Sequence, residues 1–304
     1  MTRARGQRSE VRGRRLEVTG HQSQVTGHWS LVTCLCLAAS LTGCSLNKMA
    51  VRSTSGIIQN GMPAVFRERD PQFVKEALPG NLQLMAMLIE NDSSDAGLLT
   101  AAAQGFCGYA FMFLEDENEA RASAFYEKGG AYALKAADRK GAVKDGAVDP
   151  AALTKESAPA VFWHAFCRAG FINLNRNEPD AIAELPKIMP VVEKLTAVRP
   201  DYYYNGAYAI LGAYYAVRPK LLGGDPDKAK INFDEAVKGP GADFLLNKYL
   251  AAKRYAVAAQ DAEFFERTLS EVLSAELKDD ETRLANEVAK LKARKLLEKK
   301  DELF

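Results

Sequence analysis

The chain has 304 residues, 47% of them hydrophobic, so it is long enough to bury a sizeable core in one or two domains. Its 22 glycines and 12 prolines are too few for a collagen-like or linker-rich chain. The net charge is +1, but residues 1–43 hold six arginines and two glutamates, which leaves 34 basic and 37 acidic residues in the remainder. A faintly acidic body of mixed charge lacks the basic patch that nucleic-acid binding requires, so no nucleic-acid partner is expected.

The N-terminal segment predicts export and lipid attachment. Residues 31–41 (LVTCLCLAASL) are apolar, follow an arginine-rich start and have the length of a signal-peptide core; a permanent membrane span needs about 20 residues. The next residues, Leu41–Cys44 (LTGC), resemble the bacterial lipobox, in which the chain is cleaved before a cysteine that becomes acylated. We therefore expect a signal peptide over 1–43 and a lipoprotein anchored to the membrane through Cys44. An ordinary secretory signal with a chance cysteine is the alternative.

The resemblance to the lipobox also indicates a location. It implies a periplasmic protein, and Ser45 after the cysteine favours the outer membrane. Upstream, Val18–Gln24 is nearly repeated as Val25–Leu31, and the two copies contain His21 and His28. We interpret this stretch as an overlong N-terminal extension or a start site placed too far upstream, with a metal-binding tract as the alternative.

Two cysteines remain for the body, Cys107 and Cys167. Neither belongs to a CxxC pair or has a metal-ligand neighbour, which excludes zinc and iron–sulfur sites, and no metal or other cofactor is expected. Free cysteines are usually small buried hydrophobes, and this interpretation is favoured. A disulfide between them is the alternative in an oxidising compartment.

The body is expected to be all-α, with residues 44–69 as a linker and residues 70–304 as one helical domain. Asp70 followed by Pro71 is a helix start, and Asp95 opens a later helix. We expect Gly80 and Asn81 to begin a separate helix between these two.

Further helices are predicted near 117–138 and 157–174, with a Gly- and Asp-rich loop over 141–149 between them. Pro179 opens another segment, and the prolines that follow it at 186 and 190 should kink or divide that segment.

The helix predicted over 201–217 combines large and small side chains. Tyrosines and large aliphatics fill two neighbouring stripes, and opposite them runs a strip of small side chains that would let another helix approach closely: Asn205, Ala209, Gly212 and Ala216. Asp225 and Pro226 then cap the next helix. Alternation of large and small residues across paired helices is how α-solenoid repeats interlock.

The same hairpin follows the residue order of the tetratricopeptide (TPR) pattern: Gly212, Tyr215, Ala229, Phe233, Ala236 and Pro240. A looser copy begins at Gly105, passes Tyr109, Ala122 and Tyr126, and should end at Gly129 or Gly130. The spacing is irregular, so we expect TPR-like hairpins in a solenoid or bundle rather than a regular array.

The motifs in order resemble the TatT component family of TRAP transporters. The resemblance rests on Tyr202–Tyr208 (YYYNGAY), Leu211–Tyr215 (LGAYY), Pro219, Gly223–Asp225 (GGD), and Ala229 with Phe233. It extends upstream to Trp163–Phe166 and downstream to a closing helix at Leu291–Phe304, and thus covers most of residues 95–304.

The resemblance implies a lipid-anchored periplasmic accessory subunit of a TRAP transport system. Such a subunit would form homo-oligomers, bind the periplasmic substrate-binding protein and present a channel or cavity to a small carboxylate or hydrophobic ligand. The alternative is a TPR-like envelope scaffold that mediates protein–protein assembly without handling ligands. No motif identifies the solute.

Ligand-lining candidates come from the tyrosine cluster, because tyrosine combines an apolar ring with a hydroxyl group. The candidates are Tyr203, Tyr204, Tyr208, Tyr214 and Tyr215, together with Arg168 as a carboxylate partner. The favoured interpretation is nevertheless that many of these tyrosines pack between helices and that Arg168 and His164 form a surface pair on the polar side of their helix.

We expect no enzymatic activity. His164 has no recognisable triad partners around it, and the acidic run Glu115–Glu117 is interpreted as a solvated turn rather than a catalytic pair of carboxylates.

Overall fold

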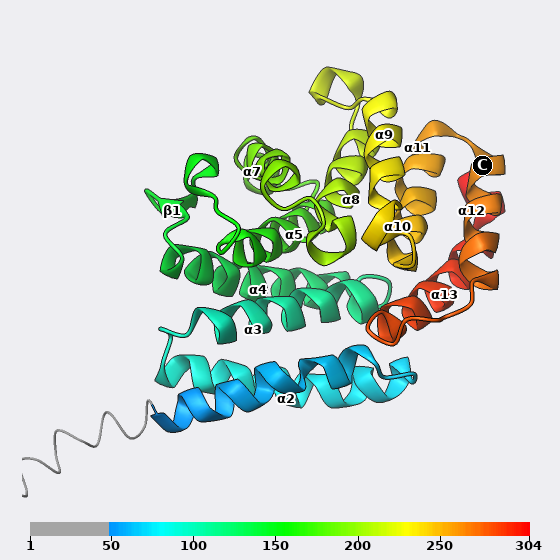
Figure 1. The fold of residues 1–304 in the computed structure, drawn as a ribbon. Coiled ribbons are helices and arrows are strands. Elements are labelled where there is room, and N and C mark those ends of the chain that lie inside the picture. The colour runs from blue at the N-terminus through cyan, green and yellow to red at the C-terminus, as the bar shows by residue number, and fades with distance from the viewer. Residues whose placement is uncertain (1–48) are drawn as a thin grey trace, which may run out of the picture. The chain divides into compact units, whose positions relative to one another are not determined.

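A computed structural model describes residues 49–304, and nearly all of their regular structure is helical (Figure 1). This confirms the all-α prediction. Within these residues the only strands are the two-residue β1 (Val143–Lys144) and β2 (Ala147–Val148), which pair antiparallel in the predicted loop. The signal peptide and Cys44 lie outside the described residues.

The first layer contains a helix over residues 49–66 and α2 (Pro71–Asn91) (Figure 1). The prediction of a linker is wrong for residues 49–66, which belong to the same compact unit as the rest. Gly56, Gly61 and Pro63 lower the intrinsic helix propensity of this segment. Its contacts with the domain outweigh that cost, because Ser55 is fully buried and donates a hydrogen bond to Asp95 at 2.5 Å.

Helix α2 is continuous, so the prediction that Gly80 and Asn81 begin a separate helix is also wrong. Asp70 caps α2 as expected by accepting hydrogen bonds from the amides of Gln72 and Phe73. Pro79 lies inside the helix, and burial of Leu82 and Met85 beyond it holds the second half in line with the first.

Above this layer lie α3 (Ala96–Tyr109), α4 (Glu119–Arg139) and α5 (Ala158–Leu174), stacked one on another (Figure 1). Asp95 caps α3, which continues into the π-helical segment η1 (Ala110–Leu114). Of the described helices, Ala96–Leu114 alone is long and apolar enough to cross a membrane, but most of it is buried in the domain, as expected of a core helix. The 3₁₀ turn η2 (Pro150–Ala152) links the hairpin to α5.

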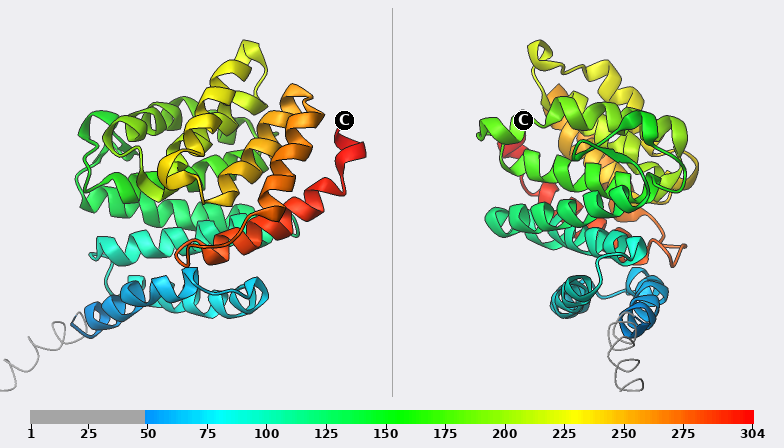
Figure 2. Two further views of the ribbon diagram at one scale, coloured as in Figure 1. Left: turned by 45° about the vertical axis from the view of Figure 1, so that its right-hand side comes forward. Right: turned by 90° about the vertical axis from the view of Figure 1, so that its left-hand side faces the viewer.

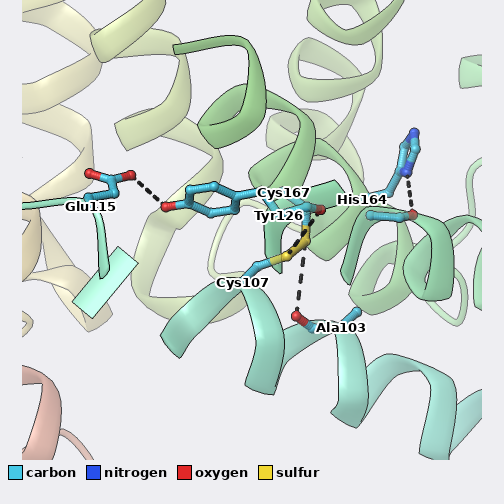
Figure 3. The surroundings of a disulfide bond; sticks show 7 residues. Ala103, Cys107, Glu115, Tyr126, His164 and Cys167 are labelled. Atoms are coloured by element: carbon cyan, nitrogen blue, oxygen red, sulfur yellow. Dashed lines mark hydrogen bonds between the residues drawn. A yellow bond between two sulfur atoms is a disulfide. The ribbon is translucent and has the colours of Figure 1, made fainter. Parts of the chain in front are cut away.

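A disulfide joins Cys107 of α3 to Cys167 of α5 (Figure 3). The favoured interpretation as free cysteines is therefore wrong, although both residues are fully buried. Gly129 of α4 leaves space for this bond, because a Cβ there would lie 2.3 Å from the sulfur of Cys107. Gly129 and Gly130, expected to end the first repeat, lie inside α4 and allow α3, α4 and α5 to pack closely.

The second TPR-like hairpin is formed by α8 (Tyr202–Val217) and α9 (Pro226–Ala236). Gly212 faces Phe233, and a Cβ at Gly212 would lie 2.8 Å from its ring. Ala229 and Ala236 are fully buried in the same interface. The predicted close approach along the small strip is confirmed at Gly212.

Between α5 and α8 the chain forms α6 (Pro179–Ile182) and α7 (Leu185–Val198), with Pro190 inside α7. Helix α8 begins in an unusual conformation, because Tyr203, Tyr204 and Asn205 have φ values of 47°, 57° and 61°. Left-handed backbone costs a residue other than glycine roughly 1–2 kcal/mol. The surrounding contacts must therefore hold these three residues in place.

The turn η3 (Lys220–Leu222) lies between α8 and α9, and the turn η4 (Gly239–Gly241) follows α9. The C-terminal part begins after η4. The next helix is continuous and consists of α10 (Leu245–Leu250), the π-helical η5 (Ala251–Ala256) and α11 (Val257–Ala259). Then come α12 (Ala262–Ser274), α13 (Arg283–Leu297) and the short α14 (Lys300–Leu303). Helix α13 lies along one side of the domain, where it contacts α10, α12 and α2 (Figure 2).

An ionic cluster ties this C-terminal part to the N-terminal layers. Asp116, just after η1, forms ion pairs with Lys253 of η5 at 3.2 Å and with Lys292 of α13. Burial by itself would raise the pKa of Asp116, but the two lysines outweigh burial and lower it to about 2. The cluster therefore joins η1, η5 and α13 by charge.

Candidate functional site

A cavity of about 390 Å³ lies between α5 and α8. Residues of α6, α7, η1, α4, α10 and η5 complete its lining. Its wall is mainly apolar and aromatic: Phe111, Phe162, Trp163, Phe166, Ile182, Leu185, Ile188, Met189, Ile210, Val217, Leu222, Phe244, Leu246 and Leu250. Cavities of this size and composition are typical of small-molecule sites.

The aromatic wall is built by mutual packing of rings from α5 and α8. The ring of Trp163 meets that of Tyr203 edge-on at 4.7 Å, and Phe162 lies 5.6 Å from the same tyrosine. Tyr203 in turn contacts Phe244, which precedes α10. Edge-to-face contacts of this kind fix the ring orientations, so the shape of the wall is largely set without a ligand.

The cavity wall also contains a buried polar pair. Tyr126 extends from α4 and donates a hydrogen bond of 2.5 Å to the carboxylate of Glu115, just after η1 (Figure 3). Glu115 is only 8% exposed, and burial together with this carboxylate raises the pKa of the Tyr126 hydroxyl well above its usual value. Arg254 of η5 lines the same cavity, and its charge acts on Tyr126.

The charged groups in the wall are mostly basic. Arg176, Arg218 and Arg254 line the cavity, whereas Glu115 is the only carboxylate that residues 49–304 contribute to the wall. Arg218 is held by stacking on Tyr214 and by donating to the carbonyl oxygen of Leu222. Arg254 lines the cavity, and no salt bridge of its guanidinium is found among the described residues, so it is available to an anionic group.

Of the five tyrosines predicted to line a ligand cavity, two do so and three do not. Tyr203 and Tyr214 line the cavity. Tyr204 stacks on Phe244 at 4.5 Å outside the wall, and Tyr215 donates a hydrogen bond to Glu193. Tyr208 is half-buried on α8 and does not contribute to the wall.

Arg168 also lies outside the cavity wall. Its guanidinium forms an ion pair with Glu184 and stacks on Phe171 at 4.2 Å. His164 is not on a polar surface as predicted, because it is 8% exposed and its Nδ1 lies 3.1 Å from the carbonyl oxygen of Gly130. Burial lowers the pKa of His164 below 6.5.

The acidic run is only partly the solvated turn that we predicted. Glu115 is buried in the cavity wall, and Asp116 belongs to the ionic cluster with Lys253 and Lys292. Glu117 is the most exposed of the three and pairs with Lys75 of α2. Each of these carboxylates therefore joins two elements of the fold.

Sequence reasoning missed Arg254 and the role of Glu115. No local pattern marks either residue as part of a site. The available signal was the run of apolar residues before Glu115, since an acidic side chain directly after a buried helix needs a partner.

Comparisons with known proteins place the chain in a family. A search of curated proteins finds no match. The family model described as TRAP transporter T-component matches residues 67–304, which is most of the chain and includes every residue of the cavity wall. The match agrees with the resemblance found in the tyrosine-rich hairpin. The chain belongs to the TRAP transporter T-component family and thus to the accessory components of TRAP transport.

Proposed function

We propose that the protein is a lipid-anchored periplasmic subunit that takes up a small amphipathic anion in its cavity and passes it to the TRAP substrate-binding protein. The cavity between α5 and α8 carries this proposal. Its wall suits an apolar body, and the excess of arginine over carboxylate favours an anionic group. Because this cavity lies in a transport family, ligand handling is favoured over the scaffold alternative.

Arg254 is the residue that we assign to the anionic group. It lines the cavity together with Tyr126 and Glu115, and its charge acts on Tyr126, whose hydroxyl donates to the buried carboxylate of Glu115. A ligand carboxylate at Arg254 would form a charge-assisted hydrogen bond. Glu115 disfavours a second anion next to it, so the proposal is a monoanion with an apolar tail.

Two features support a periplasmic location. The lipobox at Leu41–Cys44 predicts lipidation and export. The disulfide between Cys107 and Cys167 suits an oxidising compartment, since such bonds are rare in the cytosol. We propose the outer membrane as the site of anchoring because Ser45 follows the cysteine.

The partner is the substrate-binding protein encoded with the membrane permease. Arrays of helical hairpins present extended concave surfaces, and binding another protein there is their usual role. We also propose a homo-oligomer on the basis of the family. Pull-down of the co-encoded binding protein by the mature lipoprotein tests this step. Failure of the folded protein to associate, with and without the solute, would leave the scaffold function as the better account.

Ligand binding is tested by calorimetry with matched pairs of an aromatic or aliphatic carboxylic acid and its neutral amide. We expect the acid to bind better than the amide, and Arg254→Gln to remove most of this preference. Arg267→Gln is the control, because Arg267 is an exposed arginine on α12 that does not line the cavity. Equal binding of acid and amide by the unmodified protein would overturn the assignment of Arg254.

A further inference from the structure

The first layer of the domain exposes more large apolar side chains than any other part. Of the eleven such residues exposed in the described chain, five fall within 49–91, namely Met49, Ile57, Phe73, Leu84 and Met87. Ile57 is 73% exposed, Phe73 57% and Met87 56%. Single exposed hydrophobics are ordinary, but a concentration on one layer marks an interaction surface.

On α2 these residues share one face. Phe73, Ala77, Gly80, Leu84 and Met87 follow one another at helical spacing, and all five are exposed. The opposite face of α2 carries its buried residues and packs on α3. The views from the front and from the side show α2 and the helix over 49–66 as the outermost layer, with no other described element beneath them (Figures 1 and 2).

The charges of this segment suit a phospholipid surface. Residues 45–67 contain no aspartate or glutamate, and the acidic residues of this layer begin at Glu68. Arg52 and Arg67 form ion pairs with Asp92 and Glu281 but keep 65% and 55% of their side chains exposed. Basic residues beside exposed apolar ones are the combination found in segments that lie at a membrane interface. The apolar stripe of α2 itself carries no charge.

The sequence places this layer next to the proposed anchor. Four residues lie between Cys44 and Met49, and the five steps along the chain cover at most about 18 Å. This step rests on the proposed lipidation of Cys44. An anchored protein would therefore hold its first helix within that distance of the bilayer, so even weak lipid contacts would form.

We propose that the outer face formed by Ile57, Phe73, Leu84 and Met87 rests on the phospholipid surface to which Cys44 is anchored. The apolar side chains enter the boundary between headgroups and acyl chains. This contact orients the domain, with α9 on the side away from the membrane (Figure 1).

The test uses the full acylated protein in vesicles of phosphatidylethanolamine and phosphatidylglycerol. In the mature chain Cys44 is acylated and Cys107 is bonded to Cys167, so one introduced cysteine is the only free thiol. A fluorophore is attached in turn to Ile57→Cys, Phe73→Cys and Met87→Cys. The matched controls are Leu221→Cys and Ile231→Cys, which are 98% and 60% exposed and lie at the α9 end of the domain.

Lipids with brominated acyl chains should quench the labels at positions 57, 73 and 87 and leave those at 221 and 231 bright, whereas iodide in the buffer should do the reverse. Labels in the first layer that iodide quenches would overturn the proposal, because the face would then be free in water. Labels shielded from both quenchers would also overturn it, because a protein, such as a second copy of the chain, would then cover the face. Failure of the protein to float with the vesicles would refute the lipid anchor and this inference together, whereas floating without lipid quenching refutes this inference alone.

Discussion

Tyr126 reaches Glu115 because Gly170 of α5 has no side chain. A Cβ at Gly170 would lie 2.5 Å from the Tyr126 ring, far inside contact distance. The hydrogen bond between Tyr126 and Glu115 in the cavity wall therefore depends on a glycine of another helix.

Substituting Gly170→Ala should lower the free energy of unfolding by roughly 1–3 kcal/mol through overpacking. Urea denaturation measures this loss. Gly108→Ala is the matched control, because Gly108 also lies in a helix at the cavity and its Cβ would meet only the end of Met112 at 3.9 Å. The control should be neutral or stabilising by up to about 1 kcal/mol, and an equal loss in both variants would contradict the packing argument.

His164 should make stability depend on pH in mildly acidic solution. Its folded pKa is lowered below 6.5, mainly by burial, so the unfolded chain binds its proton more readily than the folded one. Stability is then fully present above about pH 6.5 and decreases as the pH falls below that value. Since residues 49–304 contain no other histidine, His164→Gln should remove most of this slope in denaturation curves taken between mildly acidic and neutral pH. A slope that stays unchanged in the variant would exclude His164 as its source.

Among the structural elements, the start of α8 stores the most backbone strain. Two buried amides hold it in place, because Asn247 donates to the carbonyl oxygens of Tyr204 and Ala236, each at 2.8 Å. Asn205 donates to the carbonyl oxygens of Glu235 and Lys238. These amides connect the left-handed stretch to the end of α9 and keep Tyr203 in the cavity wall.

Asn247→Leu should destabilise the fold by roughly 2–4 kcal/mol, because two buried carbonyl oxygens lose their donor. Thermal and urea unfolding measure the effect. Asn232→Leu serves as the comparison, since Asn232 donates to a carbonyl oxygen on the solvent side of α9 and its loss should cost within about 0.5 kcal/mol. Similar costs for the two variants would show that the buried amide has no special role.

The ionic cluster around Asp116 predicts an acid-sensitive link between elements. A folded pKa of about 2, against 3.8 ordinarily, means that the ionised form stabilises the fold above about pH 4. This contribution is lost as the pH falls through the folded value. Asp116→Asn should therefore be less stable than the unmodified protein at neutral pH, and the difference should shrink between about pH 4 and pH 2. A constant difference across that range would contradict the assignment.

Local signals in the sequence predicted most of the elements. Asp70, Asp95 and Asp225 cap the helices that were expected after them, and Gly212 makes the expected close approach, because caps and small strips depend on neighbouring residues. The cavity was harder to predict, since its lining residues are spread along the chain from Gly108 to Arg254 and meet only in the folded domain.

Arg254 lies in the π-helical η5, where an extra residue per turn shifts the facing side chains out of the 3.6-residue period. Pattern reading along the helix therefore could not assign Arg254 to the cavity. The prediction that Tyr204 lines the cavity is wrong for a similar reason. The left-handed start of α8 turns its ring away from the stripe that contains Tyr208. Both departures are local breaks in helical geometry that composition does not reveal.

For the molecule as a whole, the disulfide should contribute strongly to the free energy of unfolding. Its two cysteines are 60 residues apart, and closing a loop of that length stabilises by about 4 kcal/mol in the chain-entropy account. The double variant Cys107→Ala, Cys167→Ala should lose an amount of that order relative to the oxidised protein. Adding a reductant to the unfolded form of the native protein should produce a similar loss, and no change in either experiment would mean that the bond does not form.

The disulfide also makes the two sides of the cavity unequal. The side that contains α5 is held by a covalent bond, and the side that contains α8 is not. Helix α5 is covalently tied to α3, whereas α8 and α9 are held only by side-chain packing and a few hydrogen bonds. Local opening free energies should therefore be unequal across the cavity, with amide protons of α8 and α9 exchanging with solvent faster than those of α3 and α5. Hydrogen exchange read by mass spectrometry would show this contrast. A ligand would then enter and leave by transient displacement of α8 and α9 while the cross-linked half stays closed, so the rate of release would be set by the half of the molecule that carries no covalent link.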